Sequence, residues 1–112
     1  MNPGGAEAED IALRFLLEQG LKLKERNYTC RLGEIDLILL DGATLVFVEV
    51  RMRASRSFGG AAESITGRKR LRLIATARHY LSRQSTTPAC RFDVILMNHD
   101  SAIVWIKDAF CE

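Results

Sequence analysis

The segment formed by residues 33–53 constrains the fold of this chain more than any other. Two apolar runs flank an Asp-Gly pair, which is typical of a tight hairpin turn. Each run carries one carboxylate among hydrophobic residues, Asp36 in the first and Glu49 in the second. Burying a carboxylate costs several kcal/mol unless it is paired, hydrogen-bonded or bound to a metal. Two such residues in one hairpin therefore require a partner or a metal ion.

The position of the turn decides which residues face each other across this hairpin. A loop of residues 41–42 places Asp36 opposite Phe47, and a loop one residue further along places it opposite Glu49. Side chains alternate between the two faces along a strand. Both registers therefore bring Asp36, Glu49 and Arg51 to the same face, as a carboxylate pair beside a cation.

The periodicity of the apolar residues predicts an α/β domain with the element order α-β-β-β-α-β-β. Helices are expected at residues 5–19 and 67–83, where apolar residues recur at helical spacing. Besides the hairpin, strands are expected at residues 21–31, 91–97 and 102–107. The many charges of the first favour the edge of a sheet. The second hairpin strand is apolar on both faces, which favours its centre.

Bulk composition is that of one ordinary globular domain over residues 1–112, with residues 1–4 as a frayed lead-in. Hydrophobic residues make up 47% and charged residues 27%, and the net charge of +2 is too small to identify a partner. No apolar run approaches the roughly 20 residues that cross a bilayer. The first residues also lack the pattern of a signal peptide. Three widely spaced cysteines without a metal-binding cluster favour a cytoplasmic chain with free thiols.

Basic residues are concentrated around a glycine-rich segment and at the start of the second helix. They are Arg51, Arg53, Arg56, Arg68, Lys69, Arg70 and Arg72. Cations at a helix N-terminus oppose the helix dipole by a few tenths of a kcal/mol each, so four of them indicate a bound anion. Nucleic-acid phosphates are the candidate ligand, although a solvated helix face would give the same pattern. No residue pattern reads bases, so contacts to the backbone or to shape are expected.

Two residues of the C-terminal strands are expected to serve packing. Asp93 lies between Phe92 and Val94, and we expect it to pair with a helix end or with an Arg of the second helix. Trp105 lies between Val104 and Ile106, which favours packing in the last strand over stacking on a base.

A combination of short motifs runs along most of the chain. It consists of residues 9–12 (EDIA), 33–38 (GEIDLI), 46–53 (VFVEVRMR), Lys69 and 91–94 (RFDV). From about residue 9 to residue 110 this combination resembles the YraN family, small bacterial proteins grouped with the PD-(D/E)XK nucleases. The resemblance implies a restriction-endonuclease-like core, in which a mixed central sheet is flanked by helices.

The resemblance also implies a set of catalytic residues. Asp36 and Glu49 match the acids that bind Mg²⁺ (or Mn²⁺), and Glu9 matches an acid from the first helix that often completes the site. The superfamily places a catalytic Lys two residues after the second acid, where this chain has Arg51. Arg stays charged and presents a rigid fork, so it can stabilise a phosphoryl charge but is a poor general base. Lys69 could supply the missing ammonium group.

The residues leave three functions open. The first is a magnesium-dependent endonuclease that hydrolyses phosphodiester bonds. The second is a non-catalytic nucleic-acid-binding relative, inactive because Arg51 replaces the lysine. In that case Glu49 would form an ion pair with Arg51, and Asp36 would cap or pair locally. The third is an interaction module that forms a homodimer through Leu13 and Leu17.

Overall fold

The structure is a computed structural model that describes residues 5–52, 65–98, 100 and 102–110. The elements are α1 (Gly5–Glu18), β1 (Lys22–Cys30), β2 (Gly33–Asp41), β3 (Thr44–Met52), α3 (Gly67–Ser82), β4 (Cys90–Met97) and β5 (Ile103–Phe110). They confirm the α/β class and the predicted α-β-β-β-α-β-β order. Neither α1 nor α3 has the length and apolar character of a helix that crosses a membrane.

The five strands form one mixed sheet in the order β1-β2-β3-β4-β5. Neighbouring strands are antiparallel except β3 and β4, which are parallel. A parallel pair requires a crossover connection, and α3 lies in the crossover between these two strands. The sheet confirms the predicted edge position of β1 and the central position of β3.

The register of the β2–β3 hairpin shows that the second of the two expected loops is present, and not the loop of residues 41–42. Asp41 pairs with Thr44, so the loop consists of Gly42 and Ala43. Gly42 has φ 61°, and Ala43 does not have a positive φ. This is the pattern of a type II′ turn, which needs glycine only at its first central position. A turn over residues 41–42 of type I′ would require the strained left-handed conformation at Asp41 as well.

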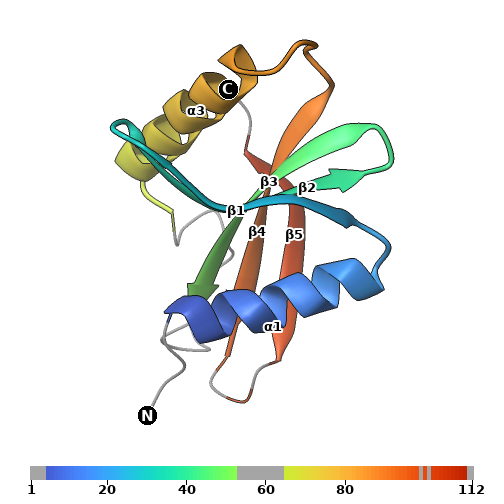
Figure 1. Cartoon of the computed structure of the whole chain (residues 1–112). Coiled ribbons are helices and arrows are strands. Elements are labelled where there is room, and N and C mark those ends of the chain that lie inside the picture. The colour runs from blue at the N-terminus through green and yellow to red at the C-terminus, as the bar shows by residue number, and fades with distance from the viewer. Residues whose placement is uncertain (1–4, 53–64, 99, 101, 111–112) are drawn as a thin grey trace.

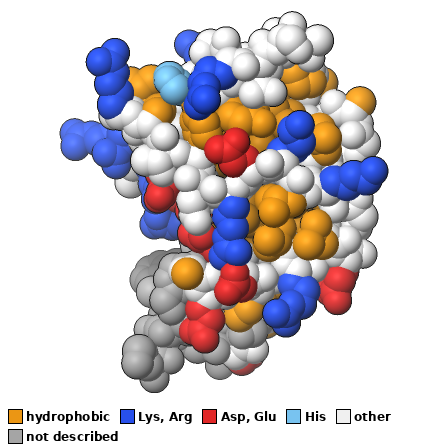
Figure 2. All heavy atoms as spheres, in the orientation of Figure 1, with side chains coloured by type: hydrophobic (Ala, Val, Ile, Leu, Met, Phe, Trp, Pro, Cys, Tyr) orange, Lys and Arg blue, Asp and Glu red, His pale blue; other side chains and the backbone are white. Residues whose placement is uncertain are grey.

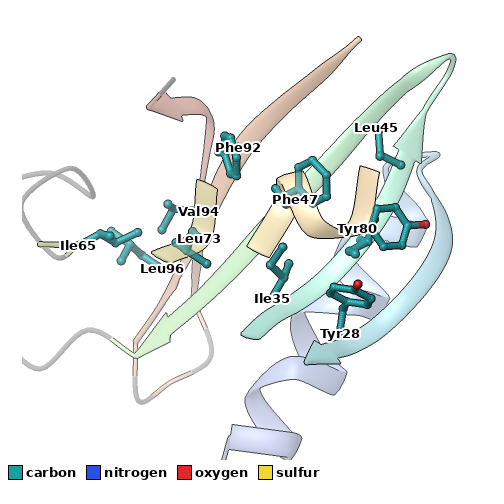
Figure 3. Close-up of a cluster of buried hydrophobic side chains, with 12 residues drawn as sticks. Tyr28, Ile35, Leu45, Phe47, Ile65, Leu73, Tyr80, Phe92, Val94 and Leu96 are labelled. Carbon is teal, nitrogen blue, oxygen red and sulfur yellow. The ribbon is translucent and has the colours of Figure 1, made fainter. Parts of the chain in front are cut away.

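The two helices cover opposite faces of the sheet, each over its own hydrophobic core (Figure 1). Beneath α3, Phe47 lies between the rings of Tyr80 and Phe92, in the cluster drawn in Figure 3. The core between α1 and the sheet consists of Ala8, Ala12, Leu16, Leu21, Leu37, Leu39, Val46, Val48, Ile95 and Met97. β3 therefore contributes alternate side chains to both cores, which accounts for its apolar sequence.

Short-range hydrogen bonds fix the ends of both helices. Gly20, at φ 98°, ends α1, where its N–H donates to Leu17 and the N–H of Leu21 donates to the Leu16 carbonyl. These two bonds form a Schellman motif, which requires a left-handed residue at this position. At the start of α3, the Thr66 hydroxyl accepts a hydrogen bond from the Lys69 N–H at 3.1 Å. The cap thus fixes the helical turn that carries Lys69.

Asp93 is a buried structural acid, and its partners differ from the predicted helix end. Its side chain has no exposed surface and accepts hydrogen bonds from the Arg91 guanidinium, the Trp105 Nε1 and the Asp108 N–H. Arg91 lies two residues earlier on the same strand rather than on the second helix. Trp105 also packs edge-on against Phe15, as expected of a packing residue. Asp93 therefore ties β4 to β5.

Replacing Asp93 with Ala would remove the acceptor of the Arg91 Nε and Trp105 Nε1 donors, although Arg91 Nη2 would keep its pair with Asp41. We expect Asp93→Ala to lower the free energy of unfolding by about 3 kcal/mol, measured by urea denaturation. Asp100→Ala is the control, because this exposed acid accepts a turn hydrogen bond from Ala102 and its loss should cost below about 1 kcal/mol. Equal effects of both substitutions would contradict a buried structural role for Asp93.

Candidate active site

A pocket of about 720 Å³ lies where α1, the β1–β2 turn, the ends of β2 and β3, and the start of α3 meet. The charged residues that line it are Glu9, Arg31, Glu34, Asp36, Glu49, Arg51, Lys69 and Arg72. Glu9, Asp36, Glu49 and Arg51, the four predicted catalytic residues, are all among them. Two helices from opposite faces of the sheet therefore contribute to one pocket.

Asp36 lies just beyond the last pair of the β2–β3 ladder. The ladder ends at Leu37 and Val48, so Asp36 and Glu49 are the next residues on their strands. Ile35 belongs to the core beneath α3, whereas Leu37 belongs to the core beneath α1, so the alternation of side chains does not continue through Asp36. Its carboxylate instead accepts a hydrogen bond from the Val50 N–H at 2.8 Å. The side chain thus points across the hairpin toward β3.

Glu49 is the buried acid of the pocket, with 7% of its side chain exposed. The Lys69 Nζ atom lies 2.6 Å from Glu49 Oε2, and the Arg51 Nη1 atom lies 3.8 Å from the same oxygen. The ion pair predicted between Glu49 and Arg51 is therefore present, but Lys69 is the closer partner. The ammonium group of Lys69, on α3, therefore lies closer to Glu49 than the guanidinium of Arg51, which follows Glu49 on β3.

Glu9 approaches the pocket from α1, with 13% of its side chain exposed. The Asn27 side-chain amide donates a hydrogen bond to Glu9 Oε1 at 2.8 Å, and Arg26 Nε lies 3.8 Å from the same oxygen. Glu7, on the same helix, is exposed and does not line the pocket. The helix therefore directs Glu9 inward and Glu7 outward.

The acids strongly affect one another's ionisation. Burial, followed by the nearby Glu49 carboxylate, raises the pKa of Asp36 from its ordinary value of 3.8 to about 7. Burial also raises the pKa of Glu9, with the Asn27 hydrogen bond opposing this shift and the neighbouring Asp36 adding to it. The four basic residues that line the pocket equal its acids in number, so the raised pKa values reflect burial first and the closeness of the acids second. A site of this kind favours a further cation or a bound proton.

The donor set suits a hard divalent cation. Within the described ranges, no group of three or more His, Cys, Asp or Glu side chains has the arrangement of a metal site. Magnesium, however, is commonly bound through one or two carboxylates together with water and substrate phosphates. Asp36 and Glu49 offer such a pair of oxygen ligands, so the residues present fit the predicted Mg²⁺ or Mn²⁺ ion.

The raised pKa of Asp36 predicts a pH-dependent stability. Between about pH 4 and pH 7 the folded protein retains a proton that the unfolded chain releases, so stability falls as pH rises through this window. Asp36→Asn keeps an acceptor for Val50 without the charge. We expect it to increase the free energy of unfolding at pH 8 by on the order of 2 kcal/mol, and to have little effect at pH 5. Thermal unfolding in metal-free buffer measures this, and equal effects at both pH values would contradict it.

The predicted nucleic-acid-binding residues that the structure describes are divided between the pocket and the surface outside it. Lys69 and Arg72 line the pocket, whereas Arg68 is exposed outside it and the Arg70 guanidinium lies over the Phe110 ring, 5.7 Å from its centroid. Arg53 and Arg56 fall outside the described residues. Figure 2 shows Lys and Arg side chains projecting where α3 and the tip of the β1–β2 hairpin lie.

Sequence patterns missed the contributions of β1 and its turn to this pocket. The sequence marks this strand only as charged and peripheral, yet Arg31 of the β1–β2 turn lines the pocket and Asn27 of β1 donates a hydrogen bond to Glu9. An Asn within a strand is an available clue, because Asn is depleted in strands and tolerates left-handed backbone conformations.

The dimer surface predicted from Leu13 and Leu17 is smaller than these two side chains together would give. Leu13 packs partly against the core beneath α1, whereas Leu17 stays 45% exposed.

Comparison with known proteins places the chain among close relatives. The model of the family described as "Uncharacterised protein family UPF0102" matches residues 8–97. A UPF0102 protein of Methylobacillus flagellatus is 56% identical over 108 residues, which cover 95% of this chain and 95% of that protein. One from Nitrosomonas eutropha is also 56% identical, over 96% of this chain and 93% of its own. These matches confirm the resemblance to the YraN family that the motifs indicate, because UPF0102 and YraN denote the same family.

Proposed function

The chain belongs to the UPF0102 family, and we propose that its pocket binds nucleic acid and hydrolyses phosphodiester bonds with a divalent metal ion. The proposal extends the mixed sheet to a restriction-endonuclease-like core of the PD-(D/E)XK type. Three features support it: acids on adjacent strands at the end of the β2–β3 ladder, a third acid from the first helix, and cations around them. The description of the family names no activity.

Asp36 and Glu49 are the proposed ligands of Mg²⁺ or Mn²⁺, with Glu9 as an additional acid at the same site. Such an ion supplies, when bound, polarisation of the phosphoryl oxygens and activation of water. The protein's own part is to orient the ligands. The Val50 N–H fixes one oxygen of Asp36 at 2.8 Å, and the buried position of Glu49 limits its side-chain freedom. Ligands whose orientation is fixed in this way bind metal at lower entropic cost.

The observation that carries the proposal is the position of Lys69. Its ammonium group, 2.6 Å from Glu49, lies beside the acid pair where the superfamily uses a lysine from the strand. Lys offers a compact ammonium that can orient water or neutralise a phosphoryl oxygen, which a rigid guanidinium does less well. Arg51, at 3.8 Å from Glu49, then does not have to act as the catalytic lysine, and its guanidinium stabilises negative charge on the phosphate. The substitution at position 51 is thereby compensated from α3.

Cations at the mouth of the pocket support nucleic acid as the substrate. Arg31 on the β1–β2 turn and Arg72 on α3 line it, both exposed to solvent. Exposed arginines can contact phosphates that flank the scissile bond, and such contacts are independent of sequence. Nucleic-acid binding by these residues would therefore weaken steeply as salt concentration rises.

One observation favours the non-catalytic alternative. Glu49 already has Lys69 and Arg51 as partners, and Asp36 already caps the Val50 N–H, so both acids have the local roles expected of a structural pair. A binding protein that has lost its chemistry would keep these contacts. The alternative predicts phosphate binding without metal binding, which the following experiments separate from catalysis.

Isothermal titration with Mn²⁺ tests the proposed ligands. We expect wild-type protein to bind, and Asp36→Ala to weaken binding by at least about tenfold, because a ligand is lost. Glu7→Ala is the matched control, since it removes an exposed acid of α1 that does not line the pocket. If wild-type protein does not bind Mn²⁺, or if Asp36→Ala binds it equally well, the metal site is refuted.

Substitution of Lys69 tests the chemistry. With single-stranded and duplex DNA as substrates and Mn²⁺ present, we expect Lys69→Met to lower kcat by about 10²–10⁴-fold, while KM changes much less. The control Lys22→Met removes an exposed lysine of β1 that does not line the pocket. A variant that loses only affinity would support the non-catalytic role, and equal turnover in both variants would exclude Lys69 from catalysis.

A further inference from the structure

Asn27 has a backbone conformation that is uncommon for residues other than glycine. Its φ is 54°, and among the described non-glycine residues only Asp108 shares a positive φ. The left-handed conformation is sterically costly for residues with a Cβ atom, although Asn tolerates it better than most. It also lies within β1, where Asn is disfavoured. Strain of this kind persists only where surrounding contacts hold it, and it is frequent at functional sites.

The contact that accompanies this conformation joins β1 to α1. The Asn27 Nδ2 atom donates to Glu9 Oε1 at 2.8 Å across 18 positions of sequence. One oxygen of Glu9 is therefore held on the β1 side. Because the same carboxyl group also lies beside Asp36, the hydrogen bond determines how Glu9 faces the acid pair of the hairpin.

Arg26 strengthens the same connection from the neighbouring position. Its Nη2 atom donates to the Ala6 carbonyl at 3.1 Å and pairs with Asp10 Oδ1 at 2.5 Å. These contacts fix the first two turns of α1 relative to β1, on either side of Glu9. Arg26 thus holds the helix and also lies 3.8 Å from Glu9 Oε1, whereas Asn27 makes the hydrogen bond to that oxygen, at 2.8 Å.

Anchoring of α1 does not require Asn27. Ala8, Ala12 and Leu16 form the buried face of α1 and dock it on the sheet by hydrophobic contact, and Asn27 is exposed apart from its hydrogen bond. The amide therefore adds little apolar burial and contributes mainly a directed donor. A donor aimed at a pocket carboxylate is the arrangement by which residues behind a metal ligand orient it.

We propose that Asn27 is a positioning residue that orients Glu9 toward Asp36 and Glu49 and so raises the affinity of the pocket for a divalent cation. This inference rests on the proposed metal site and assigns Asn27 no contact with the metal or the substrate. Its effect on binding passes through Glu9. The two residues therefore act as one unit, and removing either abolishes the same contribution.

A double-mutant cycle read out by Mn²⁺ titration calorimetry tests the inference. Asn27→Gly keeps a residue that accepts positive φ but removes the amide, and Glu9→Gln removes the charge that the amide orients. We expect Asn27→Gly to weaken Mn²⁺ binding about tenfold in the wild-type background and less than about twofold in the Glu9→Gln background. Asp108→Gly relieves the same backbone conformation away from the pocket and should leave the affinity unchanged.

The outcomes separate the inference from the proposed function. If wild-type protein binds Mn²⁺ and Asn27→Gly binds it equally, or loses the same factor in both backgrounds, the positioning role is overturned while the metal site stands. If wild-type protein does not bind Mn²⁺, both fail. Thermal unfolding of each variant, compared with Asp108→Gly, shows whether the fold persists. A loss of affinity in folded Asn27→Gly that disappears with Glu9→Gln supports the inference.

Discussion

The cost of holding carboxylates together away from water is the constraint on which the rest of this structure depends. Glu9, Asp36 and Glu49 come from three different elements and share one pocket. Burial, followed by the nearby Glu49 carboxylate, raises the pKa of Asp36 to about 7. Such an arrangement destabilises the fold near neutral pH unless a cation offsets it. The surrounding residues supply positive charge and hydrogen bonds that offset part of this cost.

The topology of the sheet brings the compensating groups to the acids. Because β3 and β4 are parallel, α3 lies in the crossover between them and covers the face that contains Phe47 and Phe92. Its capped first turn places Lys69 beside Glu49. On the other face, α1 presents Glu9, and the edge strand β1 holds that side chain through Asn27. The pocket is thus assembled by both layers of helices.

Much of this arrangement was predictable, for physical reasons that differ between residues. Hydrophobic periodicity located both helices and all five strands, since each element buries one face or both. The carboxylates Asp36 and Glu49 were conspicuous because charge is costly within apolar strands. The hairpin register was ambiguous by one residue, because the sequence permits glycine at either central turn position. The pairing of Asp41 with Thr44, together with the absence of a positive φ at Asp41, decides between them.

The remaining contacts depend on tertiary geometry that no local pattern encodes. Lys69 is one of four basic residues within five positions, and only the packing of α3 distinguishes it from Arg70, which lies over Phe110 instead. The partners of Asp93 were unpredictable because they include Trp105 and the backbone of Asp108 on the next strand. Asn27 was overlooked since its strand appeared peripheral. Its importance follows from the position of α1 above it.

We propose that Asp36 and Glu49 form a divalent-metal site served by Lys69. A crystal structure of protein grown with Mn²⁺, with anomalous diffraction measured near the manganese edge, tests it most directly. The account predicts an anomalous peak bound by oxygens of Asp36 and Glu49, with the Lys69 ammonium no longer in contact with Glu49 Oε2. A map without a peak at these carboxylates, with Lys69 still paired to Glu49, would contradict it.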